Sequence, residues 1–591
     1  MDKVLVANRG EVAVRILRGC RELGLTGVAV YSDADRDAPH VAVADEAWHI
    51  GAASPGASYL NIERIIQVAK KAGASAVHPG YGFLAENAAF AQAVIDAGIR
   101  WVGPPPEAIA AMGDKMSARQ VAERAGAPLV PGTTEPIANP DEVITFGDTH
   151  GYPIALKAAF GGGGRGMKVV AGPGEVAGAL ASAERESAAA FGRSEVYIER
   201  YLVAPRHVEA QILADQHGNV SFLGERDCSL QRRHQKLVEE APAPGLPAAV
   251  RAEMARAATA ISKTAGYVNA GTIEYLYEPA TEKVYFLEMN TRLQVEHPVT
   301  ELVSGIDIVA AQLRVAAGER LPDILGPDWE HPAGRGHAIE VRINAEDPGA
   351  GFMPAPGLVT TWKEPAGPWV RVDAGVVEGF TIPQTYDSLM AKLIVWGADR
   401  AAAIRRMRRA LDDFVIEGVP STIPFHKLAM NNPDFVSGNV STTLVEHDMD
   451  LSALAPLPSG AQAATPAKAP PRRMVIELEG KRFEVGVLAS EPVVVPERPR
   501  TPRSPKALER ARAESGGPGR ETVTTPMQGT IVKVLAAEGD TVTSGQTLVV
   551  LEAMKMENHV VAHQSGVIAK LAVSEGETVA TGATIAMIEP S

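Results

Sequence analysis

Glu552-Ala553-Met554-Lys555-Met556-Glu557 lies between the two halves of an internal repeat. Residues 529–552 align with residues 566–589 without a gap, and ten of the twenty-four positions are identical. Each half has two runs of alternating apolar residues around an acidic residue and a glycine, the pattern of half-buried strands joined by a turn. We expect the halves to close into an all-β flattened barrel over residues 523–591, with Lys555 displayed in the tight turn that joins them.

The sequence Ala-Met-Lys-Met around Lys555 resembles the attachment motif of the biotinyl domains of biotin-dependent carboxylases. Lipoyl domains share this fold, but they usually carry Asp-Lys followed by a small residue. The resemblance implies that a biotin protein ligase joins biotin to Lys555 through an amide bond. It also implies that the remainder of the chain loads this carrier.

Length, charge and cysteine content exclude several classes of protein. The 591 residues leave room for about four domain-sized units. A net charge of -14 argues against nucleic-acid binding, which needs a basic surface. Two cysteines, Cys20 and Cys228, are too few for a disulfide scaffold. There is no signal-peptide pattern and no apolar run of about 18 residues, so we expect a cytoplasmic protein that binds neither nucleic acid nor membrane.

The start of the chain predicts a doubly wound α/β domain. Residues 4–16 form an apolar run, a polar turn with glycine and an amphipathic stretch, and residues 28–31 predict the next strand. The turn lacks G-x-G-x-x-G, so dinucleotide binding is not supported. Residues 76–87 predict a strand that ends in a glycine-rich polar loop, which is where such sheets place their ligands.

A second glycine-rich segment indicates phosphate binding. Residues 153–158 predict a strand with Lys157 near its end, and four glycines and an arginine follow at 161–165. The backbone amides of such a loop can approach phosphate closely, and the loop can open and close. The P-loop ending G-K-[ST] is missing. Because Lys115 adds a second cation, we predict a nucleotide site under a mobile lid.

Two further runs predict a metal site. Residues 225–236 are rich in charge, which by itself would indicate only a solvated face. Residues 271–275 and 284–290 then alternate like strands, and pairing them as a hairpin would place Glu274 and Glu288 on one side. With the amide oxygen of Asn290 they would form an all-oxygen site suited to magnesium and substrate phosphates.

The next residues suggest acid-base chemistry on a small anion. Arg292, Gln294 and Glu296 follow the presumed metal site within a few positions. A small anion could bind to Arg292 while Glu296 accepts a proton from it.

Residues 4 to about 446 resemble the biotin carboxylases of the ATP-grasp superfamily. The similarity rests on N-R-G-E, H-P-G-Y-G-F-L, K-A-A-F-G-G-G-G-R-G-M, E-M-N-T-R-L-Q-V-E-H and R-I-N-A-E-D-P. It implies an N-terminal domain at 1–115, an ATP-grasp domain with a mobile lid at 116–330 and a C-terminal α+β domain at 331–446.

The same resemblance implies roles for individual residues. ATP would be bound by Lys115, Lys157, Gly162, Gly163, Gly164, Glu199, Leu202, His207, Gln231, His234 and Lys236. Magnesium or manganese would be held by Glu274, Glu288 and Asn290. Bicarbonate would lie at Arg292, Gln294 and Val295 with Glu296 as its base, Tyr81 would contact substrate, and Arg342 would hold the ureido oxygen of biotin as an enolate. The family commonly has serine at Ala85 and lysine at Arg200, and neither departure removes a group that the mechanism requires.

Residues 447–522 predict a linker with one short element. Residues 451–472 are rich in Ala, Pro and Ser, and residues 496–522 form a second tether of roughly 25 residues that reaches about 25 to 30 Å as a coil. Between them, 474–478 and 482–487 flank Glu479-Gly480-Lys481, which predicts a hairpin that could dock a partner.

These observations predict the alpha subunit of an acetyl- or propionyl-CoA carboxylase. It would carboxylate biotin on its own carrier with ATP and bicarbonate, and a carboxyltransferase beta subunit would complete a hetero-oligomer that supplies fatty acid or polyketide synthesis. A self-sufficient pyruvate or urea carboxylase fails on length, since 446–523 cannot hold a barrel of about 250 residues. The alternative is an inactive biotinylated carrier or scaffold, which the intact site residues argue against. Neither the acyl-CoA nor the stoichiometry follows from the sequence.

Overall fold

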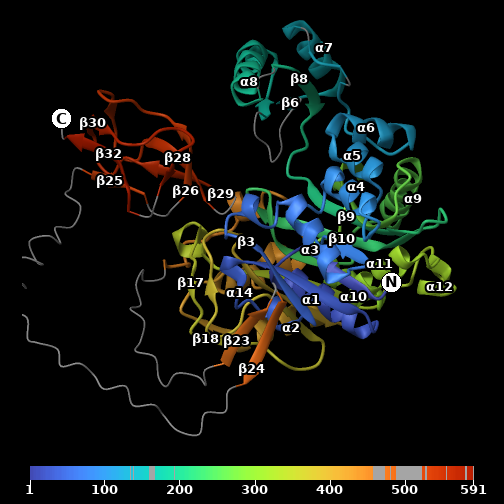
Figure 1. Cartoon of the computed structure of the whole chain (residues 1–591). Helices are drawn as coiled ribbons and strands as arrows, with labels where there is room; N and C mark the ends of the chain where they lie inside the picture. The colour runs from blue at the N-terminus through green and yellow to red at the C-terminus, as the bar shows by residue number, and fades with distance from the viewer. Residues whose placement is uncertain are drawn as a thin grey trace, which may run out of the picture. The chain divides into compact units, whose positions relative to one another are not determined.

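The computed structural model describes residues 1–133, 135–137, 139–158, 167–191, 194–456, 473–478, 481–486, 522–525, 529–553, 556–579 and 582–589 (Figure 1). The chain divides into two compact units. The N-terminal unit comprises Met1–Ile382, Leu389–Thr465 and Glu477–Arg482, and the C-terminal unit comprises Pro383–Ser388, Pro466–Ile476 and Phe483–Ser591. In the described part of the chain, no helix is long and apolar enough to cross a membrane.

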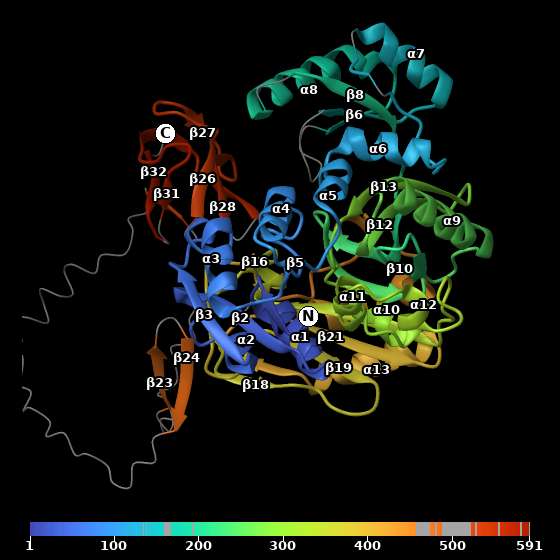
Figure 2. The same cartoon turned by 45° about the vertical axis from the view of Figure 1, so that its right-hand side comes forward.

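The N-terminal unit begins with the predicted doubly wound sheet (Figure 2). Its strands run parallel in the order β3-β2-β1-β4-β5. The elements are β1 (Lys3–Val6), α1 (Gly10–Glu22), β2 (Thr26–Ser32), α2 (Pro39–Val43), β3 (Glu46–Gly51), α3 (Ile62–Ala72), β4 (Ala76–His78), α4 (Ala88–Asp96) and β5 (Arg100–Trp101). The order reverses beside β1, where the Asn8 side chain donates to the carbonyls of Pro79 and Tyr81 at 2.6 and 2.7 Å. Such a reversal is the usual ligand position in this class of sheet.

An eight-stranded antiparallel sheet forms the centre of the N-terminal unit, in the order β13-β12-β9-β10-β11-β14-β21-β19. Its strands are β9 (Arg206–Ala214), β10 (Val220–Arg232), β11 (Gln235–Ala241), β12 (Asn269–Glu278), β13 (Lys283–Asn290), β14 (His337–Asn344), β19 (Val370–Ala374) and β21 (Leu389–Gly397). Pairing of β11 with β14 carries the sheet without a break across the boundary predicted at residue 330. Helix α9 (Ala248–Thr264) packs on one part of it through Met254, Ala258 and Ile261.

A smaller sheet contains the strand predicted before the glycine loop. Its order is β7-β6-β8, with β6 at Ile154–Ala158, β7 at Met167–Val170 and β8 at Val196–Arg200. Helices α7 (Pro140–His150) and α8 (Val176–Phe191) lie with it (Figure 1). Residues 161–166 lie outside the described residues, so the lid stays a prediction.

The remaining helices and short strands of the N-terminal unit surround these sheets. They are α5 (Pro106–Gly113), α6 (Lys115–Arg124), α10 (His297–Ser304), α11 (Ile308–Ala317), α12 (Leu321–Leu325), β15 (Glu346–Asp347), β16 (Met353–Pro354), β17 (Gly357–Leu358), β18 (Thr361–Lys363), β20 (Thr381–Ile382), α13 (Arg400–Asp413), β22 (Val415–Glu417), α14 (Ile423–Ala429) and α15 (Pro433–Ser437).

The C-terminal unit contains the predicted flattened barrel, built from two four-stranded sheets. Their orders are β25-β32-β30-β27 and β29-β28-β26-β31. The strands are β25 (Thr522–Thr524), β26 (Gly529–Val534), β27 (Thr541–Val542), β28 (Thr547–Ala553), β29 (Met556–Val561), β30 (Gly566–Leu571), β31 (Thr578–Val579) and β32 (Thr584–Glu589). Each sheet takes a short strand from the other half of the repeat, so the halves interlock. Ala553 pairs with Met556, while Met554 and Lys555 lie outside the described residues.

The predicted hairpin in the linker is present as strands β23 (Arg473–Leu478) and β24 (Lys481–Gly486), which are sheet neighbours. Lys481, predicted in the turn, is instead the first residue of β24. It pairs with Trp48 of β3, which extends the doubly wound sheet by an antiparallel strand. An added edge strand satisfies backbone hydrogen-bonding groups of the strand beside it. Strand β24 of the hairpin is therefore held at the edge of the sheet by its pairing with β3.

Candidate active site

The hairpin of β12 and β13 places two carboxylates side by side, as predicted. Glu274 pairs directly with Glu288 in the strand register, and cross-strand partners share one face of a sheet. Burial alone would raise the pKa of Glu274, but Lys236 and His207 together hold that pKa below its ordinary value. Desolvation and the neighbouring Glu274 carboxylate raise the pKa of Glu288.

The charge-rich run at 225–236 is not the solvated face that its composition suggests. It forms the hairpin of β10 and β11, and Glu225, Arg226 and Asp227 are buried. Only its tip, with Arg233 and His234 at positive φ, is exposed. Neighbouring strands supply opposite charges, which is the condition for burying ionised groups at acceptable cost.

Lys236 is the centre of the resulting cluster. Its ammonium donates to Glu209 at 2.7 Å, to Glu274 at 2.9 Å and to Glu296 at 2.7 Å. Burial would lower the pKa of Lys236, but the three carboxylates raise it well above its ordinary value. The lysine is therefore a fixed cation, placed between the predicted metal ligands and the predicted base.

Glu209 and Arg226 are site residues that the sequence analysis missed. Arg226, fully buried, donates to Glu209 at 2.5 Å, to Gln211 at 2.6 Å and to two threonine hydroxyls. Glu209 lies on β9 between His207 and Gln211, so the three polar side chains alternate on one face. Such period-two polarity, with apolar residues at every other position after Arg206, was the available signal.

Glu296 and Arg342 meet at the same cluster. Glu296 is buried at the start of α10 and accepts from Lys236 and, at 3.0 Å, from Arg342. Burial alone would raise the pKa of Glu296, but Lys236, Arg342 and Arg226 hold it well below its ordinary value. Arg342 also donates to Glu239 at 2.6 Å, and burial raises the pKa of Glu239 to about 7.

Arg292 joins this cluster to the glycine-rich loop after β4. It donates to Glu86 at 2.8 Å, to the Asn290 oxygen at 2.9 Å and to the Gln294 oxygen at 3.0 Å. Gln294 in turn donates to Glu274 at 3.2 Å. Glu86, which the sequence analysis did not assign, thus occupies the guanidinium face that a small anion would use.

The predicted ATP residues fall into two groups. His207 lies 2.9 Å from Glu274 within the buried cluster, and Gln231 pairs with Lys236 in the register of β10 and β11. Lys157 and Glu199 instead form an ion pair in the small sheet, and Arg119 adds a contact to Glu199 at 3.1 Å.

The other predicted residues are placed as follows. Leu202 is buried against Val130 and Tyr285, whereas Lys115 and His234 are exposed. The Tyr81 hydroxyl donates to Glu11, and the Val295 carbonyl accepts from Lys392. Gly162, Gly163, Gly164 and Lys555 lie outside the described residues.

The donor set fits a hard cation. Glu274, Glu288 and Asn290 offer oxygen atoms, which magnesium prefers, and the two adjacent carboxylates are better tolerated with a cation between them. A second group, formed by His207, Glu209 and Glu274, has its donor atoms within 4.8 Å of one another, as does a third formed by Glu209, Cys228 and Glu296. Burial raises the pKa of Cys228 well above its ordinary value, so the thiol stays protonated and is a poor ligand.

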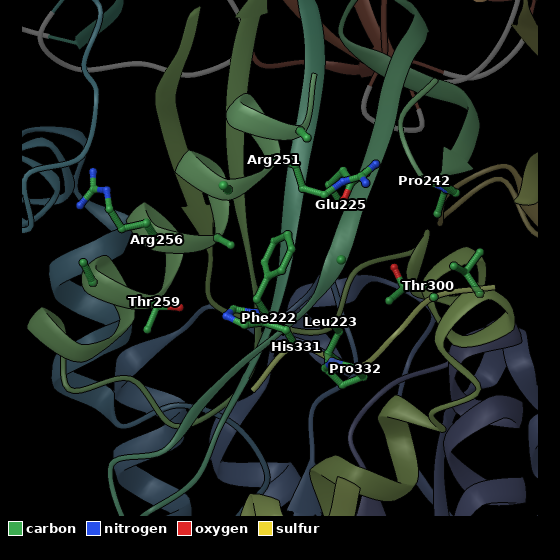
Figure 3. A pocket seen from close by; sticks show the side chains of 18 of the residues that line it. Phe222, Leu223, Glu225, Pro242, Arg251, Arg256, Thr259, Thr300, His331 and Pro332 are labelled. Atoms are coloured by element: carbon green, nitrogen blue, oxygen red, sulfur yellow. The ribbon is translucent and has the colours of Figure 1, made fainter. Parts of the chain in front are cut away.

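A separate cavity of about 870 Å³ lies beside β10 and α9 (Figure 3). Phe222 lines it, as do Arg251 and Glu225, which form an ion pair at 2.5 Å. Among the described residues that line this cavity, none is a predicted site residue. Thr300 faces it and also accepts from Arg226 at 2.9 Å, so the cavity and the buried cluster share a wall.

Comparison with known sequence families covers most of the chain. Residues 1–109 match the biotin carboxylase N-terminal domain, 114–324 the ATP-binding domain of the carbamoyl-phosphate synthase L chain, 340–447 the biotin carboxylase C-terminal domain and 521–588 the family described as biotin-requiring enzyme. Together with the buried cluster, these matches define an ATP-dependent biotin carboxylase that carries its own biotin carrier domain.

Individual relatives agree with this class. The chain is 50% identical over 570 residues to the biotin-dependent acyl-coenzyme A carboxylase alpha3 subunit of Mycobacterium leprae, covering 95% of this chain and 94% of that protein. A biotin carboxylase of a Nostoc species is 52% identical, over 75% of this chain and 98% of its own. The chain therefore belongs to the biotin carboxylase family, in the form found in biotin-dependent acyl-coenzyme A carboxylase alpha subunits.

A solved structure supports the fold of the N-terminal unit. The biotin carboxylase domain of the 2-oxoglutarate carboxylase of Hydrogenobacter thermophilus superposes with a TM-score of 0.69 at 45% identity, covering 76% of this chain and 97% of that one. That structure contains MgADP, ADP and bicarbonate.

Proposed function

We propose that this chain is the alpha subunit of an acyl-CoA carboxylase, which carboxylates biotin held on its own Lys555. Acetyl-CoA or propionyl-CoA would receive the carboxyl group on a separate carboxyltransferase beta subunit, for fatty acid or polyketide synthesis. The observation that carries the proposal is the contact of Lys236 and Arg342 with Glu296 in a chain that also holds a carrier barrel.

Glu296 is proposed as the base that deprotonates bicarbonate. Its low pKa keeps it ionised, but pairing with Lys236 and Arg342 makes it a weak proton acceptor at rest. We infer that ATP phosphates attract Lys236 and that the biotin oxygen attracts Arg342. Loss of these pairings would raise the pKa of Glu296 while bicarbonate is bound, so the base gains strength when it is needed.

Arg292 is proposed to hold bicarbonate, with Gln294 and Val295 beside it. Its guanidinium is now bound to the Glu86 carboxylate at 2.8 Å, which has the planar shape and charge of bicarbonate. A planar anion can therefore replace Glu86 at the Nε–H donor of Arg292, which is the guanidinium donor that now contacts Glu86. This exchange would place the anion next to Gln294 and the predicted base.

The remaining charges are proposed to act on ATP. Lys236 would offset the charge that develops on the transferring phosphate, and Lys115 and Lys157 would bind the other phosphates. When bound at Glu274, Glu288 and Asn290, magnesium would neutralise the phosphates, and biotin would supply the ring nitrogen that accepts the carboxyl group.

The proposal also covers the organisation of the chain. We infer functional parts at 1–115, 116–330, 331–446, 447–522 and 523–591, a division that the ranges of the four family matches support. A biotin protein ligase would modify Lys555, the protein would act in the cytoplasm, and the beta subunit would make it a hetero-oligomer.

A two-stage assay tests this function. The purified chain, given ATP, magnesium, bicarbonate and free biotin, should release phosphate only when bicarbonate is present. With ¹⁴C-bicarbonate it should label the biotin on Lys555, yet transfer nothing to acetyl-CoA or propionyl-CoA until a beta subunit is added. Absence of bicarbonate-dependent phosphate release would instead favour an inactive biotinylated scaffold. Acyl-CoA carboxylation by the chain alone would overturn the division between two subunits.

A further inference from the structure

Lys392 is a fully buried lysine for which the sequence analysis gave no role. It lies in β21, between Arg342 of β14 and Asp373 of β19 in the strand register. Its ammonium donates to the Val295 carbonyl at 2.9 Å and lies 3.1 Å from the Glu11 carboxylate and 3.7 Å from Asp373. Removing an ammonium from water costs free energy, and the carboxylates and the carbonyl around Lys392 offset that cost.

The Val295 carbonyl belongs to the peptide group that joins Val295 to Glu296. Lys392 therefore fixes the backbone directly before the proposed base. Glu296 directly precedes helix α10, and its carboxylate accepts from both Lys236 and Arg342, so a rotation of this peptide group would move the carboxylate away from both cations. Displacements of about 1 Å at such a group can cost about 10²-fold in rate.

Glu11 connects the same lysine to the other side of the site. It lies near the start of α1, is buried, and accepts a hydrogen bond from the Tyr81 hydroxyl. Tyr81 belongs to the glycine-rich loop after β4 and is a predicted substrate contact. Glu11 and Lys392 thus connect three segments, namely strand β21, the loop after β4 and the loop before α10. Each segment belongs to a different one of the three predicted parts of the carboxylase.

The surroundings hold Lys392 in its charged form. Burial alone would lower the pKa of Lys392, but Glu11, Glu340 and Asp373 together raise it above its ordinary value. Asp373 is itself paired with Arg371 at 2.8 Å, and Arg371 reaches Glu301 at 2.6 Å. These two ion pairs hold Asp373 in place, and so they restrict movement of the Lys392 ammonium away from the Val295 carbonyl.

We propose that Lys392 and Glu11 form a positioning pair for the biotin carboxylation reaction, which sets the Val295–Glu296 peptide and the Tyr81 hydroxyl relative to each other. The inference rests on the proposed function, since it takes Glu296 as the base and Tyr81 as a substrate contact. Neither member touches the reacting atoms. Their effect is on the binding geometry of bicarbonate and biotin, and ATP binding at Lys157 and Glu199 is outside their reach.

The test compares the full-length chain with three variants in the free-biotin assay, and compares the double variant with the same chain that also carries Tyr81→Phe. Lys392→Met removes the ammonium, Glu11→Gln/Lys392→Met removes both charges without leaving the Glu11 carboxylate unpaired, and Tyr81→Phe removes only the hydroxyl. The double variant should fold, with turnover lowered about 10- to 100-fold, KM for bicarbonate raised and KM for ATP within about twofold of the parent. Tyr81→Phe should raise KM for biotin in the parent chain and change nothing further in the double variant, because its partner is already altered.

Lys3→Met is the matched control. Lys3 also binds one carboxylate and one backbone carbonyl, Glu46 at 3.0 Å and Ala72 at 2.8 Å, but within the doubly wound sheet. It should leave all three KM values and the turnover unchanged. Parental turnover and bicarbonate KM in a folded double variant would overturn the positioning role, as would equal rises in the KM values for ATP and bicarbonate. An inactive parent chain would contradict the proposed function itself.

Discussion

The two units of the molecule bury different kinds of side chain. In the N-terminal unit, the eight-stranded sheet encloses Lys236, Glu209 and Glu296, with contacts of 2.7 Å. The described core of the C-terminal barrel is apolar, with residues such as Ile531, Leu548 and Leu551. Because buried charges cost free energy even when paired, the first unit gives up stability to hold reactive groups in place. The second has no such need, since the attached biotin supplies its chemistry.

Replacing Lys555, the predicted attachment residue, should have the largest effect. Lys555→Ala should abolish biotin incorporation, because Lys555 is the only lysine in the sequence of residues 552–557. Streptavidin binding and intact mass measure the loss, and Lys533→Ala, an exposed lysine of β26, serves as control. The free-biotin reaction should continue at the parental rate. Residual streptavidin binding in Lys555→Ala would reject the assignment.

Removing the proposed base should weaken the chemistry of the N-terminal unit without affecting the barrel. Glu296→Gln should lower carboxylation of free biotin by about 10²- to 10⁴-fold, the usual range for loss of acid-base catalysis, with KM for ATP little changed. Glu253→Gln, which alters a half-buried glutamate of α9 that pairs with Arg256, should have no effect. An unchanged turnover of Glu296→Gln at saturating bicarbonate would remove Glu296 from this role.

A cavity in the barrel should have the opposite outcome to loss of the base. It should destabilise the C-terminal unit and leave the chemistry of the N-terminal unit unchanged. Leu551→Ala removes a fully buried side chain from β28 and should destabilise the C-terminal unit by about 2 to 5 kcal/mol. Hydrogen exchange of amides in 529–589 measures this, while the free-biotin reaction stays at the parental rate. Leu535→Ala, at a side chain that is 53% exposed, should change stability by less than about 0.5 kcal/mol. Loss of the free-biotin reaction in Leu551→Ala would show that the two units do not fold independently.

Acid should unfold the two units at different pH values, because they differ in their buried charges. Burial alone would raise the pKa of Glu301, but Arg15, His297 and Arg371 lower it to about 2, against about 4.5 when unfolded. Its stabilisation of roughly 3 kcal/mol is therefore complete above pH 4.5 and is lost as the pH falls from 4.5 toward 2.

The readout of acid unfolding can be assigned to one unit. All six tryptophans precede residue 400, so their emission reports on the N-terminal unit. It should shift to longer wavelength near pH 3, while pepsin at that pH leaves a biotinylated barrel fragment intact. If the emission shift and digestion of the barrel fragment occurred at the same pH, the proposed difference between the two cores would be contradicted.

Local patterns were sufficient for much of the fold and part of the site. Strand alternation over 271–290 predicted the hairpin, and pairing of Glu274 with Glu288 follows because the apolar face fixes the register. The repeat predicted the barrel, although not that β27 and β31 exchange between the two sheets. Local patterns failed at 225–236, because a charge-rich run is usually solvated, and only the strands on either side make its burial favourable.

The sequence by itself determined the fold class of both units and the chemical types in the site, since these depend on periodicity, turns and short motifs. Only the tertiary structure decided which charges meet. The partners of Lys236 lie 27, 38 and 60 residues away along the chain, and Lys392 of β21 meets Glu11 of the first helix. The strength of such contacts depends on distance and burial, and both are set by the packing of strands that are remote in sequence.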